Sequence, residues 1–370
     1  MNKAVKIIIW IVVIVVIILL ITSGKGKDTG PIKIGFIGSL TGDATSLGES
    51  AQAAVKVAIE EVNAQGGING RMVEGVYEDG KCSPQPALSA AQKLITIDKV
   101  AGIVGGLCSG ETSAFVKPAM EAKIPTVTYC SSAPALTGSG KYFFRTYPSD
   151  AYQGKFAAEY AFNTLKAKKV AVIYHTSDWG NGIEKVFVER FKELGGTVVA
   201  EESAPKETRD YKTILLKVKG LTPDLIYIPT YPEGGAVLIQ QVRDLAITIP
   251  LLGGETFDDP NFLKAIPKTS KLQYTISIAT VAPDFDKKVL AKLGGSQVPV
   301  CGPQAYDAAT VLIKAMKEVG TDPDKMADYI RTLNFDGVSG HISYDQNGDL
   351  ATATYNVKQV ENNKATVITK

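Results

Sequence analysis

The sequence predicts an α/β fold in which parallel sheets are covered by helices on both faces. Short β-branched runs alternate with segments whose apolar residues recur at helical spacing, which is the pattern of a doubly wound sheet. The 35 Gly and 18 Pro residues fall at expected element boundaries and form no low-complexity tract. Because 370 residues are too many for one ordinary core, we expect about two such units.

The first unit opens with a strand at residues 32–37, followed by a helix with apolar positions across residues 47–62. Gly66 and Gly67 end this helix because they can adopt positive φ. The same alternation then predicts strand 73–79, a helix from residue 84, strand 100–105, helix 111–122, and strands 125–129 and 142–146.

A second unit is predicted after Pro148, which interrupts a strand, and Asp150, which can cap a helix running to Leu165. The chain is expected to cross between units here. Further elements are strands 169–174, 197–201, 225–229, 251–253 and 273–279, and helices 182–194, 211–219, 234–245, 304–319 and 325–332. The tail, residues 340–369, has strand periodicity with a turn at 345–348.

The amino terminus carries an export signal. Lys3 and Lys6 precede fifteen consecutive apolar residues, 7–21, and the chain then turns polar. No clean cleavage site follows, so residues 1–27 are either a removed signal or a retained membrane anchor. In both cases the body is extracytoplasmic: periplasmic, at the cell surface or secreted.

The cysteines are interpreted with that compartment in mind. Cys82 and Cys108 fall in loops after strands expected to be neighbours, so we predict a disulfide between them. Cys130 and Cys301 either form a second bridge or stay buried as small apolar residues. A metal site is not expected, since the spacing matches no zinc pattern and the histidines lie far apart in sequence.

A ligand site is expected at residues 104–113, where an apolar run breaks into small polar residues and a helix. In a parallel sheet such a loop faces a crevice, and the helix start offers N–H groups to an anion. The Ser109 hydroxyl can join them. Alternatively, Ser109 only caps its own helix.

Two function classes are disfavoured by the sequence. The net charge of +2 comes without basic blocks, so nucleic acid is not an expected partner. Residues 35–42 lack GxGxxG spacing, and neither a GxSxG elbow nor a Walker loop occurs, so no enzyme activity and no cofactor are predicted.

Several blocks together carry a resemblance: IGFIGSLTGDATSLGESAQAAVKVAIEEVNAQGGING, CSGETSA, SDWGNG, YPEGG and GGETF. In this order and spacing, from about residue 32 to the end, the chain resembles the leucine/isoleucine/valine-binding protein family, the substrate-binding components of ABC importers. The family is also similar to the ligand-binding domains of some receptors.

The resemblance implies a type I periplasmic binding protein, with two lobes joined by a three-crossing hinge and a ligand in the cleft. Lobe one would comprise residues 32–146 plus 278–339, and lobe two residues 147–277 plus 340–370. The implied partners are a small-molecule ligand such as an amino acid and the permease subunits of an ABC transporter, with the membrane added if residues 1–27 are retained.

The resemblance also implies a set of site residues. Ser109 and Ser132 match residues that hold the ligand's α-carboxylate, and the backbone carbonyl of Cys130 and the acid Glu255 match those that hold its ammonium. Trp179 matches an aromatic residue beside the ligand. The side-chain pocket includes two further residues, Thr230 and Tyr231.

Departures from the family pattern bear on the ligand side chain. Leu47 stands where some members carry a bulky aromatic residue, and Thr230 stands where a second tyrosine is usual. Alternatives also stay open: Trp179 as surface packing, Ser132 as a turn residue, and Glu255 as a solvated loop acid or cap partner. A second candidate function is a sensory ectodomain for a small amide or carboxylate that signals through a partner.

Overall fold

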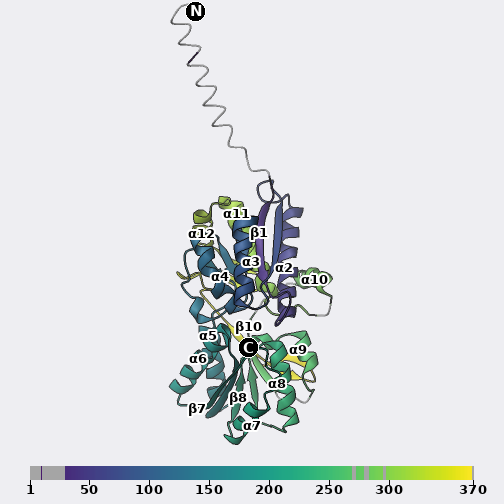
Figure 1. The fold of residues 1–370 in the computed structure, drawn as a ribbon, viewed down its shortest axis with the longest axis vertical. Coiled ribbons are helices and arrows are strands. Elements are labelled where there is room, and N and C mark those ends of the chain that lie inside the picture. Colours follow the sequence, from purple (N-terminus) through teal and green to yellow (C-terminus); the bar gives the residue numbers. More distant parts are fainter. Residues whose placement is uncertain (1–9, 11–29, 269–271, 279–282, 295–296, 369–370) are drawn as a thin grey trace, which may run out of the picture.

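The structure is a computed structural model, shown in Figure 1. It describes residue 10 and residues 30–268, 272–278, 283–294 and 297–368. The predicted signal or anchor, residues 1–27, therefore lies outside the described residues except for Trp10. Across the described ranges, no helix is both long and apolar enough to span a bilayer.

The first sheet has five parallel strands in the order β2-β1-β3-β4-β5. The strands are β1 (Ile32–Gly38), β2 (Val73–Asp79), β3 (Gly102–Val104), β4 (Thr126–Thr128) and β5 (Phe143–Arg145). They are short and largely buried, because helices cover both faces.

The helices on this sheet include a late part of the chain. They are α2 (Thr45–Ala64), α3 (Pro84–Lys93), α4 (Ser109–Glu121), α10 (Pro283–Leu293), α11 (Gly302–Val319) and α12 (Pro323–Ile330), with short turns η1 (Leu94–Asp98) and η2 (Pro134–Leu136). Helices α2 and α11 pack together on one face and α3 and α4 on the other. We call this sheet and its helices lobe one; they lie in the upper half of Figure 1.

The second sheet has seven strands in the order β14-β13-β10-β9-β8-β6-β7. The strands are β6 (Lys169–His175), β7 (Thr197–Ala204), β8 (Leu225–Ile228), β9 (Leu251–Gly253), β10 (Leu272–Ser277), β13 (Tyr355–Glu361) and β14 (Lys364–Val367). Strands β6 to β10 are parallel, whereas β13 and β14 are added antiparallel.

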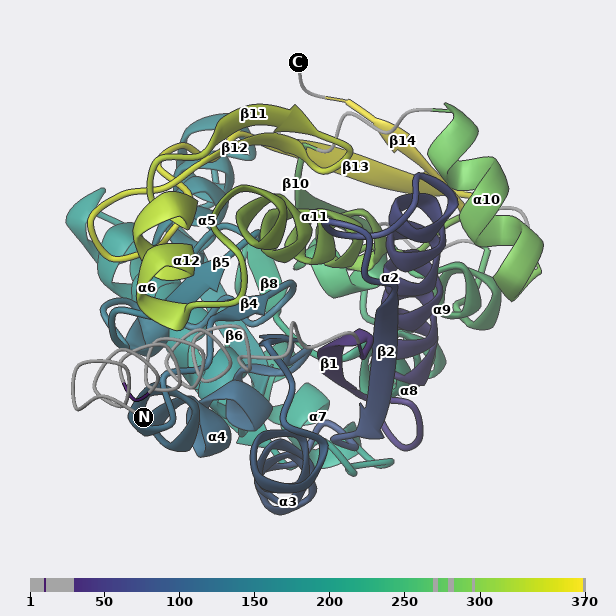
Figure 2. The ribbon, with the colours of Figure 1, turned by 90° about the horizontal axis from the view of Figure 1, so that it is seen from above.

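Helices also cover both faces of the second sheet. They are α5 (Asp150–Glu159), α6 (Asp178–Glu193), α7 (Lys212–Gly220), α8 (Pro232–Asp244) and α9 (Pro260–Ala265), with the turns η3 (Tyr160–Thr164) and η4 (Glu255–Phe257). This sheet and its helices, lobe two, lie below lobe one in Figure 1, and Figure 2 looks down the long axis. The sequence had not predicted α9, α10 or η4.

The tail differs from the predicted hairpin. Strand β12 (Gly340–Ser343) pairs back with β11 (Asn334–Gly337), and β13 turns into β14 at Asn362 and Asn363. The predicted turn at 345–348 does exist. It is closed by the Asp345 carboxylate, which accepts backbone N–H groups from Asn347 and Asp349.

Three connections join the lobes, from β5 to α5, from β10 to α10 and from β12 to β13. The third lies later than the expected boundary at residue 340. A buried ion pair joins Arg145 at the end of β5 to Asp349, and the Arg145 N–H donates to the Gly348 carbonyl at 3.0 Å. These contacts hold residues 345–349 against lobe one.

Candidate functional site

The lobe-one side of the candidate site is the start of α4. This helix begins at Ser109, two residues earlier than the sequence predicted. The Ser109 hydroxyl oxygen accepts the Ala133 N–H at 3.1 Å, so this serine bonds a neighbouring loop rather than capping its own helix. Its hydroxyl proton is left to donate, beside the helix N–H groups that have no partner within the helix.

Glu111 holds the loops around this helix start. Its carboxylate accepts N–H groups from Leu107 and Cys108 at 2.9 Å and from Cys82 at 3.0 Å. Burial raises the pKa of Glu111 to about 7, although the three hydrogen bonds act to lower it. The buried acid thus joins the loop after β2 to the loop after β3.

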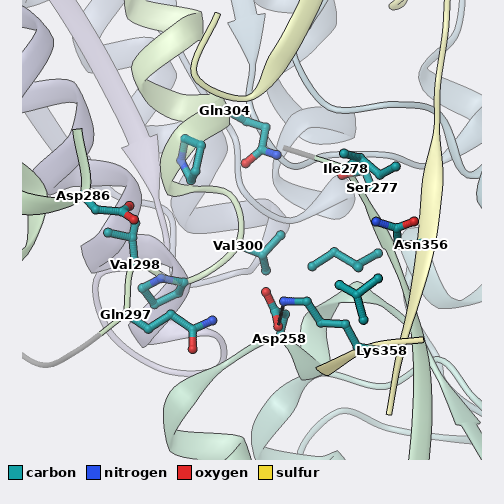
Figure 3. A pocket seen from close by; sticks show the side chains of 14 residues that line it. Asp258, Ser277, Ile278, Asp286, Gln297, Val298, Val300, Gln304, Asn356 and Lys358 are labelled. Carbon is teal, nitrogen blue, oxygen red and sulfur yellow. Dashed lines mark hydrogen bonds and ion pairs between the residues drawn. The ribbon is translucent and has the colours of Figure 1, made fainter. Parts of the chain in front are cut away.

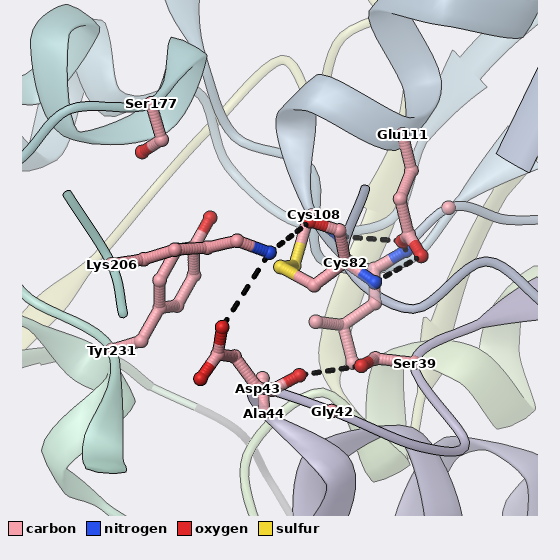
Figure 4. The surroundings of a disulfide bond; sticks show 12 residues. Ser39, Gly42, Asp43, Ala44, Cys82, Cys108, Glu111, Ser177, Lys206 and Tyr231 are labelled. Carbon is pink, nitrogen blue, oxygen red and sulfur yellow. Dashed lines mark hydrogen bonds and ion pairs between the residues drawn. A yellow bond between two sulfur atoms is a disulfide. The ribbon is translucent and has the colours of Figure 1, made fainter. Parts of the chain in front are cut away.

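Both cysteine pairs are disulfide-bonded. The predicted bond between Cys82 and Cys108 is confirmed, and it links the same two loops that Glu111 joins (Figure 4). Cys130 and Cys301, for which the sequence left two alternatives, form the second bridge. Cys130 is thereby fixed to the residue before α11.

The loop after β4 connects Ser109 to the hinge. Ser132 follows this strand, and its hydroxyl donates to an Asp150 carboxylate oxygen at 2.8 Å. The Asp150 N–H donates in turn to the Ser132 carbonyl. The Ser132 proton is thus engaged, and its hydroxyl oxygen has a lone pair left to accept a hydrogen bond.

An aromatic wall lies on the lobe-two side. Helix α6 begins at Asp178, capped by the Ser177 hydroxyl, which places Trp179 in its first turn. The Trp179 ring lies 5.1 Å from the Tyr231 ring at an interplanar angle of 32°. The Tyr231 N–H donates to His175 at 3.1 Å, and the neighbouring Thr230 hydroxyl is buried without a hydrogen-bond partner.

Glu255 is the acid of this wall. It begins the turn η4 and is 2% exposed, so it is not a solvated loop acid. The Gln153 amide donates to it, and hydrogen bonds from Gln153 and Trp179 lower its pKa, but burial is the larger effect and raises the pKa to about 7. Among the described residues, no basic side chain forms an ion pair with Glu255.

Sequence reasoning missed two members of this cluster. Asp150 was expected only to cap α5, yet Ser149 is the cap and Asp150 is buried in the first turn. Burial and the nearby Glu255 raise the pKa of Asp150. One Asp150 oxygen and the Gln153 side-chain oxygen are buried without hydrogen-bond partners. In the sequence, the only sign of these two residues was the Ser149-Asp150 pair at the start of helix α5.

The predicted residues meet at the junction of the lobes. Ser109, Trp179, Tyr231 and Glu255 are 1%, 3%, 5% and 2% exposed, as expected when two lobes are closed on each other. Cys130, Ser132 and Thr230 lie on loops at the same junction. Leu47 is buried in the core around α2.

A separate cavity of about 240 Å³ lies beside the hinge (Figure 3). Residues of both lobes line it, including Val300 and Gln304 from lobe one and Asp258, Asn356 and Lys358 from lobe two. An ion pair joins Lys358 to Asp258 at 2.7 Å. None of the predicted ligand residues lines this cavity.

Two sheet lobes, three connections and a polar site between them define a two-lobed binding protein. The chain matches the family described as periplasmic binding protein over residues 31–365. It belongs to that family. The predicted family and type I fold are therefore confirmed, and membership indicates a substrate-binding protein with an extracytoplasmic location.

Individual relatives agree with this assignment. A Pseudomonas aeruginosa leucine-, isoleucine-, valine-, threonine- and alanine-binding protein is 27% identical over 336 residues, covering 88% of this chain and 89% of that protein. The leucine binding protein LivK from Thermotoga maritima matches with a TM-score of 0.85 at 30% identity, covering 91% of this chain and 97% of that one.

A third comparison is with a protein whose structure contains a bound molecule. An ABC transporter solute-binding protein from R. palustris, in complex with benzoate, matches with a TM-score of 0.83, covering 92% of this chain and 96% of that one. Its 21% identity shows a shared fold alone.

Proposed function

We propose that this protein is the extracytoplasmic substrate-binding protein of an ABC importer and binds a branched-chain or related amino acid between its lobes. One observation carries the proposal: the buried acids Glu255 and Asp150 lie together, and no cation of the described chain pairs with Glu255. A buried carboxylate without a counter-charge is costly, and a ligand ammonium would supply that charge.

The ammonium site would be made of acceptors from both lobes. Glu255 offers a carboxylate, and Asp150 offers its unpartnered oxygen. The Ser132 hydroxyl oxygen and the Cys130 carbonyl complete the set on the lobe-one side. An ammonium donates three hydrogen bonds and accepts none, so a cluster made of acceptors suits it.

The carboxylate site would lie at the start of α4. The Ser109 hydroxyl and the first N–H groups of the helix would donate to an anion, and the helix dipole favours negative charge there. The contacts from Ser109 through Ala133 and Ser132 to Asp150 connect this donor site with the acceptors. A zwitterion fits this division of donors and acceptors.

The ligand side chain would contact the aromatic wall. Trp179 and Tyr231 provide flat apolar surfaces, and the Cys82–Cys108 disulfide faces Tyr231 from lobe one (Figure 4). The Thr230 hydroxyl is buried and unpartnered, so a ligand with one polar side-chain group can bond it. Threonine therefore belongs in a screen beside leucine, isoleucine and valine.

The surroundings of the protein follow from this assignment. Export by residues 1–27 would place both lobes outside the cytoplasm, and retention of the apolar segment would anchor them at the membrane. Permease subunits of an importer would then receive the ligand. The lobes would be residues 32–146 plus 278–350, and 147–277 plus 351–370, with closure about the three connections.

A thermal-shift screen of the chain without residues 1–27 tests the ligand class. Binding to the folded state raises the melting temperature, so amino acids should raise it. The matching carboxylates without an amine, such as 4-methylpentanoate for leucine, should not. A rise with benzoate and with none of the amino acids would contradict the proposal while leaving the fold assignment intact.

A further inference from the structure

Helix α2 begins without a cap of its own. Its N-cap residue, Ala44, has a left-handed backbone and no side chain able to accept a hydrogen bond, and its first turn contains no acidic residue. The first N–H groups of any helix need partners from outside the helix. For this helix of 20 residues, those partners must come from elsewhere in the fold.

Lobe two supplies one of these partners, to the N–H of the N-cap residue. Glu233, in the first turn of α8, places both carboxylate oxygens 3.2 Å from the Ala44 N–H. Asp259, before α9, bonds the Ser46 hydroxyl in the first turn of α2. Carboxylates also interact favourably with the positive end of a helix dipole. Helix α2 of lobe one is thus capped across the cleft by lobe two.

A cation from lobe two makes a second contact across the cleft. Lys206, after β7, donates to the Cys82 carbonyl at 2.8 Å and lies 3.5 Å from Asp43 (Figure 4). Arg209 approaches the same carboxylate at 3.7 Å. Lys206 is 20% exposed and Asp43 15%, so water screens this ion pair only in part.

We infer that Lys206 and Glu233 are positioning residues that hold the lobes together before a ligand binds. Their partners are the Cys82 carbonyl, the Asp43 carboxylate and the Ala44 N–H, and we assign none of these groups to the ligand. They form a clasp, defined here as these five residues. A ligand that binds the closed form gains affinity in proportion to the closed fraction, so the clasp also raises ligand affinity.

Closure without ligand can be measured through Trp179. The chain has two tryptophans, Trp10 and Trp179, so full-length protein carrying Trp10→Phe reports on Trp179 alone. Trp179 lies at the start of α6, which packs against α4 of lobe one. Acrylamide should quench this buried indole weakly when the lobes are closed, and more strongly when they are open.

The variants are Lys206→Met and Glu233→Ala in that background, without ligand and at low salt. Each should increase the quenching of Trp179 and the radius of gyration from small-angle scattering. Lys212→Met and Glu207→Ala are the matched controls, since both residues are exposed and the described structure gives their side chains no ion pair. Circular dichroism checks folding.

Salt provides a second readout. In about 1 M NaCl, where the Debye length is about 3 Å, the parent protein should approach the Lys206→Met variant. Equal quenching and equal radii for parent, Lys206→Met and Glu233→Ala at low salt would overturn the inference. This result does not depend on the ligand, so it is distinguishable from failure of the proposed function.

The predicted effect on ligand affinity rests on the proposed function. Its test uses L-leucine as the probe. Calorimetry at low salt should show a dissociation constant raised by up to about fivefold by Lys206→Met, the upper end of the range for loss of one ion pair that water screens in part. High salt should reduce this difference. If Lys206→Met leaves the dissociation constant unchanged but increases the quenching of Trp179, the link between the clasp and ligand affinity is overturned, while the role of the clasp in closure stands.

Discussion

Glu255 shows most clearly how single residues define the site. It is buried, and it accepts hydrogen bonds from neutral side chains. Burial opposes the ionisation of Glu255, and burial together with the charge of Glu255 opposes the ionisation of Asp150. Strongly raised pKa values of buried acids cluster at functional sites.

Glu255→Gln should weaken amino-acid binding steeply, because the ligand ammonium would lose its charged partner inside a closed cleft. The expected loss is about 2 to 4 kcal/mol, or roughly 30-fold to 1,000-fold in the dissociation constant. Ser109→Ala should cost less, about 1 to 2 kcal/mol, because helix N–H groups still hold the carboxylate. Titration calorimetry measures both. Binding by Glu255→Gln as tight as the parent's would show that Glu255 is not the ammonium site.

Amino-acid affinity should fall as the pH drops below about 7. The pKa of Glu255 is about 7 in the ligand-free protein, and an ammonium would lower it, so binding must release a proton at lower pH. The dissociation constant should then rise by up to about tenfold per pH unit. Calorimetry in buffers of different ionisation enthalpy counts the released protons, and Glu255→Gln should flatten the profile.

The same pKa has the opposite consequence for the ligand-free fold. The pKa of Glu255 in the folded state lies above its ordinary value of 4.5. The stability that this group contributes to the folded state is therefore fully present below about pH 4.5. This contribution is lost as the pH rises through about 7. Low pH therefore favours the protonated form of the Glu255 carboxyl group, whereas ligand binding favours its ionised form.

At the scale of elements, the start of α4 is the best-defined part of the site. Glu111 and the Cys82–Cys108 disulfide join the same two loops, one by hydrogen bonds and the other covalently. Together they fix the position of Ser109. A helix start that is anchored in this way can present its N–H groups without rearranging.

Glu111→Gln should destabilise the fold, because an amide has one acceptor oxygen where three N–H donors converge. The expected loss is about 1 to 3 kcal/mol in the free energy of unfolding. Thermal or urea unfolding of the oxidised protein measures it. Glu121→Gln is the control, since Glu121 lies on the same helix in an exposed pair with Lys117. Equal effects for both variants would contradict the role given to Glu111.

Alternating strands and helices could be predicted because their periodicities are local. The residues at which helices begin were harder to predict. The sequence prediction began this helix at Gly182, but the Ser177 cap starts α6 at Asp178. The tail was mispaired because strand periodicity does not specify the partner, and β13 pairs with the distant β10.

For the whole molecule, the arrangement of the lobes determines what the site contains. Sequence motifs that follow predicted strands identified Ser109, Trp179 and Glu255 as candidate ligand residues. Lys206 lies in none of these motifs, and Glu233 lies in YPEGG without any sign of its role, because the partners of both residues lie in the other lobe. Contacts across a cleft depend on the relative position of two units, which local patterns do not encode.

Saturating L-leucine should reduce the radius of gyration of the protein in small-angle scattering, because a ligand held by both lobes favours their closed arrangement. The decrease should be larger in Lys206→Met, whose ligand-free form starts more open. Lys212→Met should behave as the parent does. An unchanged profile together with calorimetrically proven binding would contradict closure about the three connections.

The Cys130–Cys301 bond encloses most of lobe two in a covalent loop. The two cysteines are 171 residues apart, and β6 to β10 all lie between them, while β13 and β14 lie outside. A single protease cut within residues 131–300 therefore leaves both pieces of chain joined. The cut protein should run as one band on a non-reducing gel and as two after reduction. Outside the cytoplasm, where the disulfide persists, a molecule cut once in such a loop stays one covalent unit.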